Sequence, residues 1–552
     1  MHLPTITVTS LSLVLLLTLL RHLLSHLRSL TFIRAHACRP ARHITWTREP
    51  LLGLDFMAKC VSFSRTGFYM RFLASRFTTV GTTYLTRRLA YDTLHTADPE
   101  NIKYMLATGF ENYGLAKLRI DAMRPLFGEG IFTTNGGMWS HYRAVLRPSF
   151  TRGNMTPLLE MMERHWTAMR GLVPFPGDME ADGGGDGDGF SGVFDIQSLF
   201  FCFTMDTATE FLMGASTHTL DPHRKSDKER QFVADYMDSL YETVRQIAFG
   251  KLQFLSRTPK GIAEKRARAW AYVDGFVDEV LSNKEKRGDV TAGTGYNFLE
   301  EIAAQTSDKT LMRNQVLGAL LASRDTTAAL MSNLFYLLAR NPAVYAKLRR
   351  EVLSKIEGEL PTEAEMGNMT YLRWCINEAL RMYPVVPGNT REALCDTILP
   401  VGGGSDGRSP LFVKKGTPVM YNVYAMHRRK DIYGEDADTF NPERWDGLRP
   451  GWGFLPFNGG PRVCIGRKSA HNSILTHHYS QSSSGRCQPD LSIENFALTE
   501  TSYVTVRILQ TFEVLESRDD SPWMEQYALV MCSRNGVQVA VKPAASSKGA
   551  VM

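Results

Sequence analysis

Apolar side chains recur with helical spacing through the middle of the chain. They return every three or four positions in five long segments, at residues 155–172, 200–213, 228–248, 262–284 and 311–339. This period is typical of helices that each bury one face, and the last segment is followed by Pro342, which cannot continue a helix. Strand-like pieces separated by glycines gather at residues 398–421. The pattern predicts a mainly α fold with a smaller β region.

A nearly continuous apolar run occupies residues 3–20, which is about the minimum length that crosses a bilayer as a helix. The charged residues between this run and Glu49, histidines aside, are all arginines: Arg21, Arg28, Arg34, Arg39, Arg42 and Arg48. By the positive-inside rule this predicts a single-pass anchor with the rest of the chain in the cytoplasm. A cleaved secretory signal and a mitochondrial presequence are the alternatives. They are disfavoured because no small-x-small site ends the run, and because the run is leucine-rich rather than amphipathic.

Composition excludes several classes of protein. With 43% apolar and 22% charged residues among 552, the chain is an ordinary globular protein rather than a disordered one. The net charge of +6 is scattered, so we expect no nucleic-acid partner. The eight cysteines are far apart and include no CxxC pair, which favours a reducing compartment.

We divide the chain into an anchor (1–30), a basic linker (31–60) and one large domain (61–545), with a Gly- and Asp-rich surface loop at 178–192.

One cysteine stands in a glycine-rich segment, FNGGPRVCIG at residues 457–466. Glycines let a backbone turn tightly and approach a porphyrin, nearby N–H donors favour a thiolate, and an arginine can pair with a haem propionate. The segment resembles the FxxGxRxCxG signature of the cytochrome P-450 family at every fixed position: Phe457, Gly460, Arg462, Cys464 and Gly466. An ordinary buried cysteine in a turn is the plainer alternative. The resemblance implies the α-rich P-450 fold, bound haem b, and Cys464 as the axial ligand of its iron.

Two further elements of the same family have counterparts in the sequence. Glu378 and Arg381 share a helix face, and Arg444 stands in a segment that resembles the PERF motif. The resemblance implies a buried structural network of these three residues that braces the cysteine loop. Trp139 and Arg143 resemble the WxxxR element, whose side chains reach a haem propionate, and Arg391 has the place of another propionate-binding residue. Taken alone, each would be an ordinary surface or packing feature.

Residues 322–327, ASRDTT, resemble the oxygen-binding motif A-G-x-D/E-T-T of that family. Oxygen activation requires delivered protons, so an acid beside an alcohol is the needed chemistry, and Asp325 and Thr326 are the candidate relay. A hydroxyl that bonds back to its own helix and a solvated carboxylate are the plainer interpretations. Ser323 departs from the usual glycine, and we expect its side chain to crowd the groove over the haem or to alter the local helix distortion.

The resemblance implies a monooxygenase that inserts one atom of O2 into a C–H bond of a small apolar substrate. No Rossmann fingerprint or flavin domain follows residue 466, so electrons from NADPH require a separate partner, an NADPH-cytochrome reductase of the endoplasmic reticulum membrane. Segments 128–132, 203–211 and 423–429 are similar to those of fungal alkane and fatty-acid hydroxylases. A long-chain fatty acid or n-alkane is therefore the expected substrate. A fungal secondary-metabolite oxidase and a haem-thiolate isomerase or dehydratase are the alternatives.

Residues 468–494 interrupt the family pattern. Asn495–Glu500 would continue Cys464–Arg467 without a gap, whereas the intervening stretch is rich in Ser, His and Gln and lacks helical periodicity. We interpret it as an insertion, such as a translated retained intron or a gene-model error. Its histidines and its cysteine do not have the spacing of a compact set of zinc ligands: His471, His477, His478 and Cys487. Together with Ser323, the stretch motivates the alternative of a haem-deficient pseudoenzyme.

Overall fold

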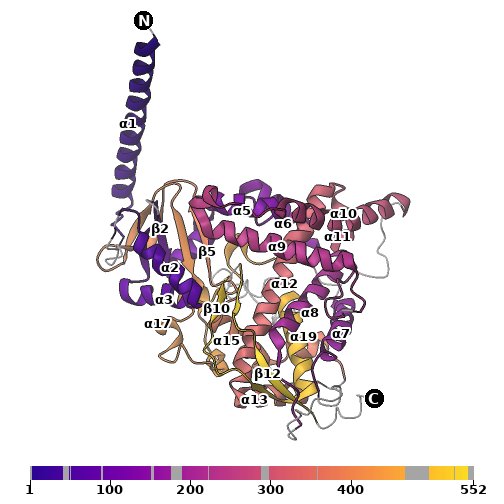
Figure 1. The fold of residues 1–552 in the computed structure, drawn as a ribbon. Helices are drawn as coiled ribbons and strands as arrows, with labels where there is room; N and C mark the ends of the chain where they lie inside the picture. The colour runs from indigo at the N-terminus through magenta and orange to yellow at the C-terminus, as the bar shows by residue number, and fades with distance from the viewer. Residues whose placement is uncertain are drawn as a thin grey trace, which may run out of the picture.

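The computed structural model describes residues 3–41, 49, 51–88, 91–150, 155–175, 189–221, 223–287, 298–356, 359–465, 496–527 and 529–544. Most of the described chain is helical, with a smaller β region to one side (Figure 1). The longer helices are α1 (Leu3–Ala35), α2 (Leu54–Thr66), α3 (Tyr69–Val80), α5 (Lys117–Phe127), α6 (Gly136–Leu146), α7 (Met155–Arg170), α8 (Ile196–Met213), α9 (Asp227–Phe249), α10 (Ile262–Arg287), α11 (Phe298–Gln305), α12 (Lys309–Ala339), α13 (Pro342–Lys355), α15 (Thr370–Met382) and α19 (Phe496–Thr511). The short ones are α4 (Pro99–Lys103), α14 (Glu363–Gly367), α16 (Val423–Met426) and α17 (Lys430–Tyr433). The predicted fold class is confirmed.

The five helices predicted from periodicity are α7, α8, α9, α10 and α12. Their ends follow local chemistry. Helix α8 begins four residues before the predicted start because the Asp195 side chain accepts the N–H of Gln197 at 3.1 Å. Helix α9 begins at a capping box in which Ser226 and Glu229 satisfy each other's backbone N–H groups. The predicted loop at 178–192 lies mostly outside the described residues.

The β region is built around one five-stranded sheet of order β1-β2-β8-β5-β3. Its strands are β1 (Thr83–Arg88), β2 (Tyr91–Thr96), β3 (Tyr113–Gly114), β5 (Gly388–Ala393) and β8 (Pro418–Asn422), and only β2 and β8 pair in parallel. The remaining strands form three small sheets: β6 (Thr397–Gly403) with β7 (Ser409–Val413), β10 (Glu525–Tyr527) with β11 (Met531–Ser533), and β12 (Gln538–Pro543) between β4 (Phe194–Asp195) and β9 (Phe512–Ser517). The predicted strand region at 398–421 thus supplies β6, β7 and β8.

Helix α12 runs through the middle of the helical part, against α8, α15 and α19 (Figure 1). Its second half is buried in a core shared with α7, α8, α15 and α19, and its first half in a core shared with α5, α9, α10 and α11. This position explains why the periodic signal of α12 is weak over its last turns: residues 327–339 are buried on all sides. The predicted proton-relay residues lie between the two halves.

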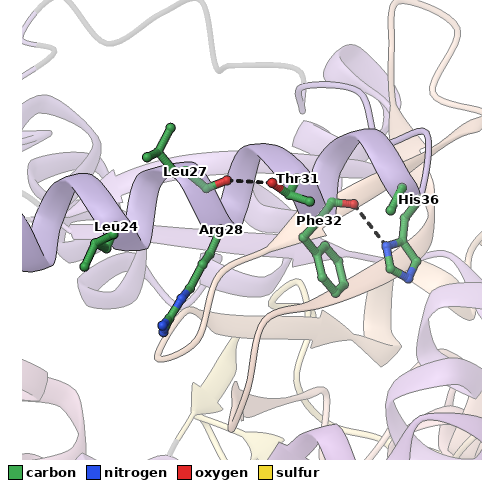
Figure 2. A pocket seen from close by; sticks show the side chains of 7 residues that line it. Leu24, Leu27, Arg28, Thr31, Phe32 and His36 are labelled. Carbon is green, nitrogen blue, oxygen red and sulfur yellow. Dashed lines mark hydrogen bonds between the residues drawn. The ribbon is translucent and has the colours of Figure 1, made fainter.

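Helix α1 stands out from the body of the molecule (Figure 1). It is longer than the apolar run that predicted it, and Leu13–Ala35 is the stretch long and apolar enough to cross a membrane by length and composition. Just after it, the Arg39 N–H donates to the Pro410 carbonyl at 2.8 Å, and Ala41 pairs with Gly403. The chain therefore docks on the β6–β7 hairpin before it enters the domain. An open pocket on α1 itself runs from Leu24 to His36 (Figure 2).

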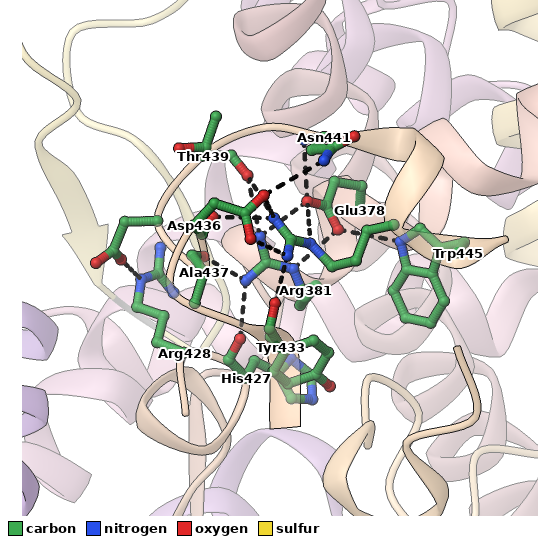
Figure 3. Close-up of polar contacts among 12 residues, drawn as sticks. Glu378, Arg381, His427, Arg428, Tyr433, Asp436, Ala437, Thr439, Asn441 and Trp445 are labelled. Atoms are coloured by element: carbon green, nitrogen blue, oxygen red, sulfur yellow. Dashed lines mark hydrogen bonds and ion pairs between the residues drawn. The ribbon is translucent and has the colours of Figure 1, made fainter. Parts of the chain in front are cut away.

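A buried ion-pair network joins α15 to residues 427–445 (Figure 3). Neither Glu378 nor Arg381 exposes any side-chain surface, and Arg381 Nε and Nη2 donate to the two Glu378 carboxylate oxygens at 2.8 and 2.9 Å. Arg444 Nε donates to Glu378 Oε1 at 3.2 Å, and the Trp445 indole N–H donates to Oε2 at 3.0 Å. The structure thus brings together Glu378, Arg381 and Arg444, and every oxygen of the central carboxylate is hydrogen-bonded.

The same network extends to the segment before the cysteine loop. Arg381 Nη1 donates to the carbonyl of His427 at 2.9 Å, and His427 Nε2 accepts the N–H of Leu455 at 2.9 Å. Leu455 lies two residues before Phe457, the first position of the cysteine motif. One imidazole therefore connects the buried arginine to the start of that loop.

Replacing Glu378 by Gln keeps the shape of the side chain but removes the charge that balances Arg381. Breaking a buried pair costs about 3–5 kcal/mol, and we expect the free energy of unfolding to fall by about this amount. Lys430→Met is the matched control, because the ion pair of Lys430 with Glu435 is largely exposed. Its loss should lower the free energy of unfolding by less than about 0.5 kcal/mol. Urea unfolding of both variants measures the difference, and equal losses would contradict the assignment.

Burial, and after it the charges of Arg381 and Arg428, lowers the pKa of His427 to about 3 from its ordinary 6.5. Between these values the unfolded chain binds a proton that the folded chain does not, so stability falls as pH drops below about 6.5. We expect His427→Gln, which keeps an acceptor for Leu455, to reduce this loss by up to about 1.4 kcal/mol per pH unit. Urea midpoints measured from pH 7 to pH 4 test this, and parallel curves for the two proteins would contradict it.

Candidate active site

The cysteine loop follows a short 3₁₀ turn at Gly460–Arg462. The backbone N–H of Cys464 donates to the Phe457 carbonyl at 2.9 Å, and the Asn458 side-chain amide donates to the Arg462 carbonyl at 3.0 Å. These two bonds close the loop on itself. The Cys464 side chain is exposed and therefore accessible to a ligand. Gly466 lies outside the described residues.

Gly460 is required by a close approach of two backbones. Its φ is +64°, and a Cβ at this position would lie 1.7 Å from the carbonyl oxygen of Leu106. Leu106 belongs to the single π-helical turn at Tyr104–Thr108. The structure thus gives this glycine a close contact with another segment of the protein, and its approach to a porphyrin stays a prediction. The loop is thereby fixed against the domain.

Arginine side chains converge beside this loop. Arg462 donates from Nη2 to the Thr134 carbonyl and to Asn135 Oδ1, each at 3.0 Å, and its guanidinium lies 4.5 Å from the centroid of the Trp139 ring. Its Nε is buried and has no hydrogen-bond partner among the described residues. Burial, and then the charges of Arg391, Arg119 and Arg143, lowers the pKa of Arg462 to about 9. Burial is therefore the larger cause of this shift, and three neighbouring positive charges add to it.

The other members of this cationic cluster are Arg391 on β5, Arg119 on α5 and Arg143 on α6. Arg391 on β5 is buried, and Arg119 on α5 is half-buried. Both donate to one acceptor, Asn389 Oδ1, at 3.2 and 2.7 Å. No carboxylate lies within ion-pair distance of Arg143, Arg391 or Arg462 in the described part of the chain. Two propionates of a haem would supply the missing negative charge, so these residues fit that group.

The predicted WxxxR pair lies on α6, at the edge of the same cluster. Trp139 is buried, and its ring contacts the guanidinium of Arg143 at 5.8 Å in addition to that of Arg462. Burial lowers the pKa of Arg143, and the nearby Cys464 acts in the opposite direction. The structure therefore brings Trp139, Arg143, Arg391 and Arg462 together beside Cys464. Arg119 was missed, because a lone arginine outside any motif carries no signal in a single sequence.

The predicted relay residues are not linked to each other. The Thr326 hydroxyl donates to the Ala322 carbonyl of its own helix, and Asp325 pairs with Arg324. Burial raises the pKa of Asp325, and Arg324 partly offsets this. The Ser323 hydroxyl likewise donates to the Ala319 carbonyl, at 2.9 Å. Asp325 must separate from Arg324, and the Thr326 hydroxyl from the Ala322 carbonyl, before these two residues can pass a proton between them.

Comparison with known proteins agrees with this geometry. The family model described as cytochrome P-450 matches residues 52–476. The monooxygenase himC of Aspergillus japonicus is 40% identical over 511 residues, which are 92% of this chain and 84% of that protein. The monooxygenase FPY7 of Fusarium mangiferae is 37% identical (92% and 91% covered), and cytochrome P-450 52A12 of Debaryomyces hansenii is 35% identical (89% and 90% covered). The chain therefore belongs to the cytochrome P-450 family of monooxygenases.

Proposed function

We propose that this protein binds haem b through Cys464 and inserts one oxygen atom of O2 into a C–H bond of a long-chain fatty acid or n-alkane. The observation that carries the proposal is the exposed cysteine beside Arg143, Arg391 and Arg462, which form no ion pair with a carboxylate in the described part of the chain. When bound, haem supplies the redox chemistry, and a thiolate ligand favours cleavage of the O–O bond. The residues of the chain hold this group and deliver protons to its distal side.

Each part of the site has a separate task in this proposal. The arginine cluster of Arg119, Arg143, Arg391 and Arg462, with Trp139, would hold the two propionates. Asp325 and Thr326 deliver protons to oxygen, for which Asp325 must leave Arg324 and Thr326 must turn from Ala322. Burial keeps the pKa of Asp325 above its ordinary value, which favours a group that takes up and releases protons.

The substrate class rests on resemblance at the level of the subfamily, and the structure gives the three resembling segments structural roles. In segment 203–211, Asp206 accepts bonds from Thr217, Thr219 and Leu220 and so shapes the loop after α8. In segment 128–132, a Cβ on Gly128 would lie 2.2 Å from the Asn314 amide. The third segment contains His427. These segments support a shared framework, and a fungal secondary-metabolite oxidase on the same framework remains the second candidate.

We place the protein in the endoplasmic reticulum membrane with α1 as a single-pass anchor. The arginines that follow the apolar run favour a cytoplasmic catalytic domain. On that side it would meet an NADPH-cytochrome reductase, the expected source of electrons.

Residues 468–494 are proposed to be an insertion, and the position of α19 supports this. Although α19 lies beyond the family match, it packs against α7, α12 and α13 in the main core.

Cys464→Ser should abolish thiolate ligation. We expect the reduced, carbon monoxide-treated wild type to show a Soret band at about 450 nm, the sign of thiolate-ligated haem, and the variant to lack it. Cys395→Ser is the matched control, because Cys395 is also exposed but lies outside the haem-binding motif, on the loop between β5 and β6. A wild type without this band would favour the haem-deficient pseudoenzyme instead.

A substrate that displaces distal water should shift the spin state of the ferric haem. We expect long-chain fatty acids or n-alkanes to give a saturable shift, and their oxidation to require NADPH and the reductase. The measurement is an optical titration followed by product analysis. A shift only with aromatic or polycyclic compounds would favour the secondary-metabolite oxidase, and turnover without NADPH would indicate an isomerase or dehydratase.

A further inference from the structure

A second carboxyl group, which the proposed chemistry does not use, is buried where three helices meet. Glu500, on α19, exposes no surface, and the Thr207 hydroxyl of α8 donates to its Oε1 at 2.5 Å. Its Oε2 has no hydrogen-bond partner in the described part of the molecule, and neither has the buried hydroxyl of Thr327 on α12. Helices α8, α12 and α19 lie against one another here (Figure 1).

Among the described residues, no cation forms an ion pair with this carboxyl group. Burial raises the pKa of Glu500 to about 8, while Thr207 and Thr327 act in the opposite direction. The ionisable groups on the surrounding helices make no contribution to this pKa: Glu163, Arg164 and His165 on α7, Asp206 and Glu210 on α8, Asp325 on α12 and Arg507 on α19. At neutral pH the group therefore carries its proton. A protonated carboxyl both accepts and donates, so it can serve Thr207 and Thr327 at once.

The position of Glu500 matters because the helices around it lie next to both parts of the proposed site. Thr327 directly follows the Asp325–Thr326 pair on α12. Helix α19 is the first described element after the Cys464 loop, from which residues 466–495 separate it. Glu500 therefore lies on the helix that follows the axial cysteine, and this helix packs against α12, which carries the distal pair.

We propose that Glu500 is a positioning residue: as a neutral acid it ties α19 to α8 and α12 beside Thr327, and so fixes the spacing between the proximal and distal sides of the site. The inference rests on the proposed function for the identity of these two sides. A different contact docks α19 on α7, because Tyr503 and Arg507 donate to Glu163 at 2.7 and 2.8 Å. This second contact offers a control on the same helix.

The test compares Glu500→Gln, Glu500→Ala and Glu163→Gln in the full chain with haem. The readouts are thermal stability and the C–O stretching frequency of the reduced carbon monoxide complex, which reports on the distal side. We expect Glu500→Gln to match the wild type in both. Glu500→Ala should lower stability and shift or broaden the C–O band, whereas Glu163→Gln should lower stability and leave the band unchanged. An unshifted band in Glu500→Ala, or a shifted one in Glu500→Gln, would overturn the proposal.

Should Glu500→Ala fail to fold, the pH dependence of the other proteins decides. Between about pH 4.5 and pH 8 the folded chain keeps a proton that the unfolded chain releases, so the wild type should lose stability as pH rises through this range. Its C–O band should change near pH 8, where the buried group itself loses the proton. Glu500→Gln should show neither change, and a transition identical to that of the wild type would overturn the proposal. Absence of the thiolate Soret band from the wild type itself would instead refute the proposed function, so the two failures are distinguishable.

Discussion

Positive charge gathered beside the cysteine loop is the constraint on which the site depends. Arg119, Arg143, Arg391 and Arg462 come from separate elements, and burial, followed by repulsion from the other three arginines, lowers the pKa of Arg462 to about 9. A fold that gathers such charges is stabilised by whatever ligand balances them, since binding to the folded state alone adds to its stability. Haem, with two carboxylates and an iron that takes a thiolate, meets both requirements of the site. We therefore expect cofactor binding and folding to be coupled.

The loop itself is held by the protein from several directions. The Glu378–Arg381 network reaches it through His427, the π-helical turn at Tyr104–Thr108 meets it at Gly460, and its own hydrogen bonds close it. None of these contacts involves the chain that follows Ile465. These contacts hold the loop from residues that precede it in the chain and from the loop itself.

Much of the fold and the site was predictable because the signals are local. Helical periodicity marks α7 to α10 and α12, and the motifs that resemble the family contain Trp139, Arg143, Arg391, Arg462 and Cys464, which the structure brings together. Arg119, His427 and Glu500 carried no such signal, because their roles arise from contacts between residues far apart in sequence. The relay was predicted as a pair, but Thr326 bonds to Ala322, since a carbonyl one turn back is always within reach. Helix α1 exceeds the predicted run because its arginines, being good helix formers, do not end it.

The central claim is that Cys464 binds the haem iron as a thiolate in the chain as it stands, with residues 468–494 present. X-ray absorption at the iron edge of the full-length protein, purified with haem, measures this directly because sulfur and nitrogen ligands scatter differently. The account predicts one sulfur atom in the first coordination shell of the iron. A shell of nitrogen and oxygen atoms alone would contradict it.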